Sequence, residues 1–138
     1  MISLFSTVNW IGILLAFVAY CILGGLWFTV LFKKPYATSL GKNSDELHNT
    51  SPVFIAGPAI CSLVITLTTA ILLRALGIDT YGKGIEFALV TGIGYLVANT
   101  VNIAINPNMP RPFLYSAISG AFHLTGLLIA TTILVAMG

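Results

Sequence analysis

A histidine inside a long apolar segment is the side chain best placed to do chemistry. Apart from tyrosines and thiols, His123 is the only ionisable side chain deep within such a segment. Imidazole can transfer protons, bind a metal ion, or donate and accept hydrogen bonds, and an ionisable group inside a membrane segment is a candidate functional residue. The alternative is a histidine held in the interior by Asn99, or by a hydroxyl such as Ser62 or Thr66. Because burial disfavours the charged imidazolium, we expect a neutral ring.

A line of polar residues lies on the preceding apolar segment. Asn99, Asn102 and Asn106 follow a spacing of i, i+3 and i+7, which places them on one face of a helix. An asparagine that faces hydrocarbon leaves two donors and an acceptor unpaired, so we expect these side chains to face protein or water. They are either interhelical hydrogen-bonding groups or the lining of a cavity open to the cytoplasm. The candidate polar path comprises His123, Asn99, Asn102, Asn106, Ser119 and Tyr95.

The sequence contains few residues that are suited to other kinds of chemistry. The carboxylates Asp45, Glu46, Asp79 and Glu86 lie in or beside polar segments, so no acid/base pair is expected inside the apolar ones. Neither a glycine-rich phosphate loop nor a nucleophile-elbow motif occurs. Within the apolar segments, the possible metal ligands are one imidazole and two cysteines, which is a poor ligand set. We therefore predict no enzyme activity, no cofactor and no metal site.

The composition assigns most of the chain to lipid. Hydrophobic residues make up 57% of the 138 residues and charged residues only 7%, whereas a soluble domain carries about 25% charged residues. The mean hydropathy of +0.99 agrees. A net charge of +2 is too small to indicate a nucleic-acid partner. These values exclude a soluble enzyme, a nucleic-acid binder and a disordered tail, and they predict an integral membrane protein in a lipid bilayer.

Four apolar runs are long enough to cross a bilayer, which takes about 20 helical residues. Their interiors contain no Asp, Glu, Lys or Arg, and they are too long for barrel strands, so each predicts a transmembrane helix. The predicted helices cover about residues 8–32, 53–76, 85–105 and 112–137. Because the second and third loops are short, consecutive helices should be antiparallel neighbours. The predicted fold is all-α: one domain, residues 1–138, forming an antiparallel four-helix transmembrane bundle.

The longest loop is expected to contain a short surface helix within residues 35–51. Asn43 and Glu46 have the spacing of a capping box, which predicts a helical turn at residues 45–48.

The distribution of Lys and Arg predicts the orientation. An excess of positive charge marks the cytoplasmic side. The first and third loops carry Lys33, Lys34, Lys42 and Arg111, whereas the other side carries Arg74 and Lys83. We therefore expect both termini on the extracytoplasmic side.

Small and polar residues recur on one side of each predicted helix, where they would mediate helix–helix contacts in lipid. They are Gly12, Ala16, Tyr20, Gly24 and Trp27; then Ala59, Ser62, Thr66 and Thr69; then Ala88, Thr91, Gly92, Tyr95, Asn99, Asn102 and Asn106; and finally Ser116, Ser119, Gly120, His123 and Gly126. The opposite faces are rich in Leu, Ile, Val and Phe, so we expect them to face lipid.

Several short motifs occur in a characteristic order. They are Asn9-Trp10, Gly24-Gly25-Leu26-Trp27-Phe28, Leu31-Phe32-Lys33-Lys34, Asn102, Arg111-Pro112 and Gly120-Ala121-Phe122-His123-Leu124. Together they resemble the signatures of the small multipass membrane proteins called domain of unknown function 1761. The resemblance covers Asn9 to the C-terminus, with Tyr36 standing where members often have tryptophan. It implies a mostly bacterial family of four-span membrane proteins, and it implies no particular activity.

Two classes of function fit these residues. The first is a small-solute transporter or channel subunit with a polar path along helices three and four, its solute unknown. Four short helices enclose little volume, so we expect such a protein to be a homo-oligomer. The alternative is a non-catalytic structural or accessory membrane protein whose polar residues only pack the bundle. A water-filled crevice between helices three and four would favour the first, and a dry interior the second.

Overall fold

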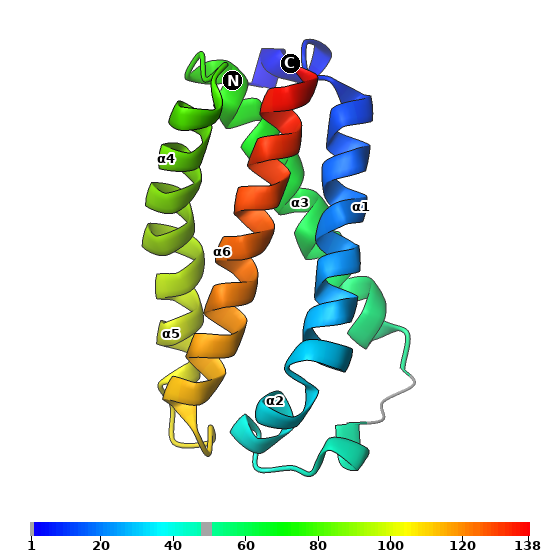
Figure 1. The fold of residues 1–138 in the computed structure, drawn as a ribbon, viewed down its shortest axis with the longest axis vertical. Helices are drawn as coiled ribbons and strands as arrows, with labels where there is room; N and C mark the ends of the chain where they lie inside the picture. Colours follow the sequence, from blue (N-terminus) through cyan, green and yellow to red (C-terminus); the bar gives the residue numbers. More distant parts are fainter. Residues whose placement is uncertain (1, 48–50) are drawn as a thin grey trace.

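The computed structural model describes residues 2–47 and 51–138, and their regular secondary structure is entirely helical (Figure 1). The α-helices are α1 (Trp10–Leu26), α2 (Lys33–Ser39), α3 (Val53–Ala75), α4 (Tyr81–Thr91), α5 (Ala98–Ala104) and α6 (Pro112–Met137). A π-helical segment, Trp27–Leu31, extends α1, and a second one, Gly92–Val97, joins α4 to α5. Two 3-10 turns lie at Ile2–Ser6 and Ser44–Leu47.

Four of these helical stretches are long and apolar enough to cross a membrane. They are Trp10–Leu31, Val53–Ala75, Tyr81–Ala104 and Pro112–Met137. At 1.5 Å per residue each exceeds the roughly 30 Å hydrocarbon thickness of a bilayer. The predicted all-α class, with four long apolar helices, is therefore confirmed.

The helix ends follow from local hydrogen bonds. The Asn9 side chain accepts hydrogen bonds from the backbone N–H groups of Ile11 and Gly12, so α1 begins at Trp10. At the end of α3, Gly77 adopts a left-handed φ of 63°, and the Ile78 N–H donates to the Leu73 carbonyl over 2.9 Å. Gly77 thus ends α3 as its C-terminal cap.

The third long helix begins one turn earlier than predicted, at Tyr81 instead of residue 85. The two glycines in this turn, Gly82 and Gly84, disfavour a helix by propensity, but packing overrides propensity here. Gly84 is buried against α6, where a Cβ at its position would lie 3.1 Å from Val135 Cγ2 and 3.2 Å from Thr131 Cγ2.

The loop between the first two long helices holds two short elements where one surface helix was predicted. α2 begins at Lys33, directly after the π-helical end of the first span, and a 3-10 turn follows at Ser44–Leu47. The Glu46 carboxylate accepts hydrogen bonds from the Asn43 N–H (3.3 Å) and side-chain amide (3.1 Å), which confirms one half of the capping box. The predicted turn also included His48, which lies outside the described residues.

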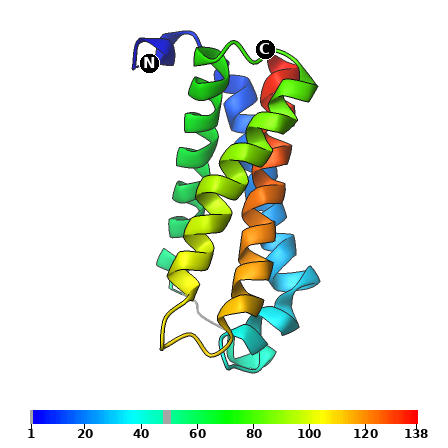
Figure 2. The same ribbon diagram turned by 90° about the vertical axis from the view of Figure 1, so that its left-hand side faces the viewer.

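The four long helices lie side by side, and α6 contacts each of the others (Figures 1 and 2). Half of its span is buried (50%), compared with 22% for each other long helix. Figure 1 shows α1 and α4–α5 running down from the end that holds both termini, with α3 and α6 running back up. The Asn9 amide donates to the Met137 carbonyl over 2.9 Å, which ties the start of α1 to the end of α6.

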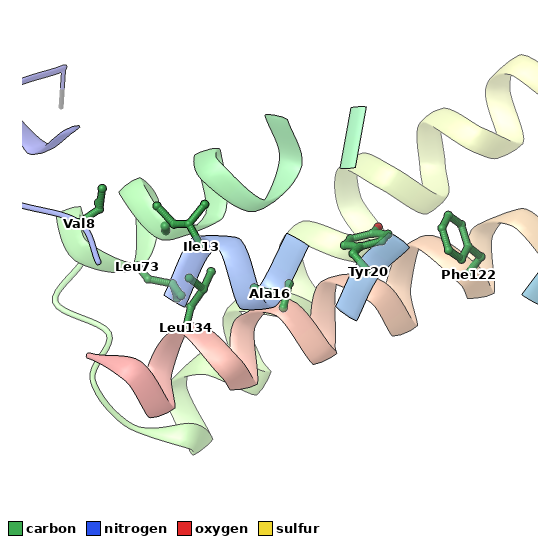
Figure 3. Close-up of a cluster of buried hydrophobic side chains, with 9 residues drawn as sticks. Val8, Ile13, Ala16, Tyr20, Leu73, Phe122 and Leu134 are labelled. Carbon is green, nitrogen blue, oxygen red and sulfur yellow. The ribbon is translucent and has the colours of Figure 1, made fainter. Parts of the chain in front are cut away.

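A core of apolar side chains fills the contact between α1, α3 and α6 (Figure 3). It runs from Ile13 and Leu134, near the end with the termini, to Tyr20 and Phe122. Small residues allow the backbones to approach, and Ala16 and Ala130 are fully buried within it. The predicted inward faces of the first, second and fourth helices are confirmed for most of their residues.

Candidate functional site

The side chain of His123 meets a tyrosine from α1. The Tyr20 hydroxyl lies 3.4 Å from His123 Nδ1 and donates to the His123 backbone carbonyl over 3.2 Å. Because a phenol has one hydrogen, a hydroxyl that donates to the carbonyl can accept at the same time from a protonated Nδ1. Tyr20 is fully buried, and His123 is half-buried. The pair thus joins the first and last long helices through a partly buried polar contact.

The neighbours of Tyr20 explain its position. Its ring lies directly on the backbone of Gly126, where a Cβ would overlap the ring atoms Cε1 and Cζ. The ring of Phe122 packs edge-on against it, with centroids 5.5 Å apart and planes at 77° (Figure 3). Phe122, His123 and Gly126 of α6 therefore form a contact surface for the flat ring of Tyr20.

The partners predicted for His123 are not the ones that the structure places there. Ser62 donates to the Pro58 carbonyl (2.9 Å) and Thr66 to the Ser62 carbonyl (2.8 Å), so both hydroxyls bond to their own helix. Asn99 is exposed on the outer side of α5. The expectation that these groups bind His123 was wrong, because the two hydroxyls bond within their own helix and Asn99 faces outward.

Three hydroxyls on α6 are buried without a hydrogen-bond partner among the described residues: those of Ser116, Ser119 and Thr131. Ser119, a predicted site residue, is only 4% exposed. It lies one turn before His123, but no hydrogen bond joins the two within the part of the chain that the structure describes. Buried hydroxyls usually have partners, so burying these three hydroxyls of α6 costs free energy of folding.

The polar line on the third long helix faces the opposite way from the prediction. Asn99, Asn102 and Asn106 are exposed, and Tyr95 is 75% exposed. Within residues 2–47 and 51–138, the side chains of Asn99 and Asn102 make no hydrogen bond. Asn106 has a local role at the end of α5, because its amide donates to the Ile103 carbonyl and its oxygen accepts from the Asn108 N–H, both over 2.8 Å.

The π-helical segment explains this error. The buried face of the third long helix starts as predicted with Ala88 and Gly92. In a π-helix the backbone hydrogen bonds connect i to i+5 instead of i to i+4, so residues after Gly92–Val97 are rotated relative to a regular helix. Thr100 and Ala104 consequently face inward, and the asparagines face outward.

An aromatic cluster at the other end of α1 was not predicted as a site. The Trp27 indole donates to the Ile118 carbonyl over 3.1 Å, and Phe28 packs against Phe122 with centroids 5.0 Å apart. Tyr36 of α2 stacks near Tyr115, with centroids 5.9 Å apart. Burial raises the pKa of the Tyr36 phenol, and Tyr115 raises it further. Tyr36 therefore stays uncharged at neutral pH, as suits a packing residue.

Two surface cavities lie at opposite ends of the long helices. One, of about 390 Å³, lies beside the termini, and its polar lining includes Asn9, Arg74 and Asp79. The other, of about 440 Å³, lies beside Lys33, Lys34 and Asp45. No residue of the predicted polar path lines either of them. Among the described residues, no three His, Cys, Asp or Glu side chains gather as metal ligands.

The described residues thus form an all-helical protein with four helices suited to a membrane and one buried Tyr–His contact. A family model described as protein of unknown function (DUF1761) matches residues 11–135, and the chain belongs to this family. The resemblance indicated by the sequence motifs is confirmed. Neither the comparison with curated proteins nor the comparison with solved structures gave a match.

Proposed function

We propose that this protein is an integral membrane protein of a bacterial cell membrane, folded as an antiparallel four-helix transmembrane bundle. The four long apolar helices support this proposal. The start of α2, which holds Lys33 and Lys34, and the start of α6, which follows Arg111, lie at the end away from the termini (Figure 1), so that end would be cytoplasmic and both termini extracytoplasmic. Reporter fusions at Gly138 and near Lys42 should therefore land on opposite sides. Both on one side would contradict the topology.

Within the membrane, the protein acts as a non-catalytic accessory or structural subunit of a larger assembly. The observation that carries this proposal is the exposure of Asn99 and Asn102 on the outer side of an apolar helix. The interior supports a packing role, because the Tyr20 ring packs on Gly126 and its hydroxyl meets His123. The polar groups left for a further task are on the outside.

The depth of Tyr95 and Asn99 favours a partner. Tyr81–Ala104 is about 36 Å long, compared with roughly 30 Å of hydrocarbon. Asn99 lies about 7 Å, and Tyr95 about 13 Å, before the end of this stretch. Each Cα–Cβ bond tilts toward the helix N-terminus, so these side chains point to the membrane centre. An unpaired amide in hydrocarbon costs several kcal/mol, which a protein partner would remove.

A second candidate function is a transporter or channel subunit whose path lies between copies. The line formed by Tyr95, Asn99 and Asn102 favours it, because these groups could hydrate a shared path. A spin label at position 102 separates the two candidates. A water-filled path would expose the label to a water-soluble relaxation agent, whereas a packed interface would protect it from both that agent and lipid-dissolved oxygen.

A photoreactive benzoylphenylalanine at position 95, in native membranes, tests the assembly proposal. We expect an adduct with a protein at this position, and loss of that adduct when Asn99 and Asn102 are replaced by leucine. The matched control places the same group at Val30, which is 66% exposed on the first long helix, and should capture only lipid. Capture of lipid alone at position 95 would contradict the assembly.

A further inference from the structure

We propose that the partner of this outer surface is a second copy of the same chain, in the same membrane orientation and related by a two-fold axis. This inference rests on the proposed function, because it requires an assembly in the membrane. The surface, called the Asn face below, consists of Gly94, Tyr95, Ala98, Asn99 and Asn102, all of them exposed.

The Asn face points away from the rest of the chain. Thr100 and Ala104, on the other side of α5, are buried, and α5 packs on α6. Asn99 and Asn102, spaced i and i+3 within α5, lie on one face of that helix, and Tyr95, in the π-helical segment before it, is exposed as well. A neighbouring helix in the membrane could contact these three residues at once.

Hydrogen-bond complementarity selects a second copy as the occupant. An asparagine amide both donates and accepts, so two identical amides can satisfy each other. A parallel two-fold axis places Asn102 opposite Asn102 and Asn99 opposite Asn99 at equal depth, since each residue meets its own counterpart near the axis. An antiparallel copy would place the asparagines of the two chains at opposite ends of the membrane. The Asn face contains no charged residue, so it offers no ion pair to a partner with intramembrane charges.

The shape of the Asn face also allows close approach. A Cβ built at Gly94 would have no atom within 4 Å in this chain, so the surface there is open. Ala98 follows at i+4, which gives two small residues one turn apart, the spacing that lets transmembrane helices approach closely. Close approach is required for short asparagine side chains to reach across an interface.

Two exposed threonines of the long helices do not need a second copy. Thr29 donates to the Gly25 carbonyl over 2.6 Å, and Thr132 donates to the Leu128 carbonyl over 2.8 Å. A hydroxyl can be satisfied by its own helix in this way. The amides of Asn99 and Asn102 make no such bond among the described residues, which makes the Asn face different from those positions.

Cysteine cross-linking in lipid vesicles that contain only this purified chain tests the inference. Cys21 and Cys61 are first replaced by alanine, and Asn102→Cys is then introduced. We expect oxidation to give a disulfide-linked dimer through position 102, because the two-fold axis brings both copies of this residue together. The matched control, Val30→Cys, lies near the same end of its span and should stay monomeric. Equal dimer at both positions, or none at position 102, would overturn the inference.

A second pair of variants guards against an effect of cysteine on folding. Gly94→Leu places bulk on the Asn face, whereas Gly25→Leu places the same bulk at another exposed glycine with no atom within 4 Å of its Cβ. With fluorescently labelled chains, energy transfer at increasing lipid dilution gives the dimer dissociation constant. We expect it to rise about tenfold or more with Gly94→Leu and with Asn99→Leu/Asn102→Leu, but not with Gly25→Leu. An unchanged constant in both Asn-face variants would refute the two-fold dimer.

The result can be separated from that of the proposed function. If position 95 captures a protein of different mass in native membranes, and the purified chain does not dimerise, the assembly remains and the second copy is wrong. If position 95 captures only lipid, the assembly itself is wrong.

Discussion

The polar residues of α6 and those of α5 have similar spacing but opposite surroundings. On α6, Ser119 and Gly126 are buried, and His123 meets Tyr20. On α5, Asn99 and Asn102 are exposed and unpaired among the described residues. His123 and Gly126 join α6 to α1 through Tyr20, whereas the two asparagines are available to something outside the chain. Polar residues in an apolar helix can therefore mark either an interior or a contact surface.

The difference between the two helices comes from their geometry. α6 is an uninterrupted α-helix from Pro112 to Met137, so a period of 3.6 residues holds along its length. The helix of Tyr81–Ala104 contains the π-helical segment Gly92–Val97, and the period predicts the wrong face after it. The comparison teaches that a facing prediction applies only up to the next change in helical pitch.

The largest effect is expected from Gly126→Ala, which attacks the buried site on α6. The new methyl group would overlap the Tyr20 ring, and neither can move easily because Tyr20 is fully buried. We expect the free energy of unfolding in mixed micelles to fall by about 3 kcal/mol. Gly94→Ala is the matched control on the outer surface and should leave it unchanged or slightly higher. Equal losses in the two variants would remove the contrast between the helices.

A smaller effect is expected from Tyr20→Phe. This change deletes the hydroxyl that joins His123 Nδ1 and the His123 carbonyl but keeps the ring on Gly126. The free energy of unfolding should fall by about 1 kcal/mol, as for other interhelical hydrogen bonds in membranes. Tyr95→Phe removes an exposed hydroxyl and should change it by less than about 0.5 kcal/mol. A Tyr20→Phe variant as stable as the parent would show that the polar contact contributes nothing.

The smallest effect on the single chain is expected from Asn102→Leu. Because this side chain is exposed, its loss should change the unfolding free energy of the dilute, monomeric protein by less than about 0.5 kcal/mol. Thr100→Leu, two residues away and only 9% exposed, should lower it by about 1–2 kcal/mol through overpacking. A larger loss of unfolding free energy for Asn102→Leu than for Thr100→Leu would show that the asparagine line faces inward.

Much of the fold could be predicted from the sequence because lipid imposes simple rules. Uninterrupted apolar runs predicted the four long helices. The Gly92–Val97 segment contains no residue that requires a π-helix. The segment packs closely against α6, where a Cβ built at Gly120 would lie 3.3 Å from Val97. Such contacts depend on tertiary structure and could not be predicted from the local sequence.

The candidate site was predicted only in part for a related reason. Tyr20 and His123 were both placed on inward faces, and both lie there. Their pairing depends on the relative height of α1 and α6, which the Asn9 contact with Met137 helps to set. The two residues are 103 positions apart in the chain, so no local pattern connects them. For the same reason, the contact between Gly126 and the Tyr20 ring could not be predicted from the sequence.

The central position of α6 also determines the order in which the molecule can be completed during synthesis. α6 leaves the ribosome after the other three long helices, and at translation rates of about 5–20 residues per second it follows Tyr20 by roughly 5–20 s. During that interval Tyr20 lacks Gly126 and the His123 carbonyl, and Gly84 and Gly92 lack the side chains that cover them. Until α6 is made, the first three helices therefore form an incomplete intermediate. The final helix completes the native protein.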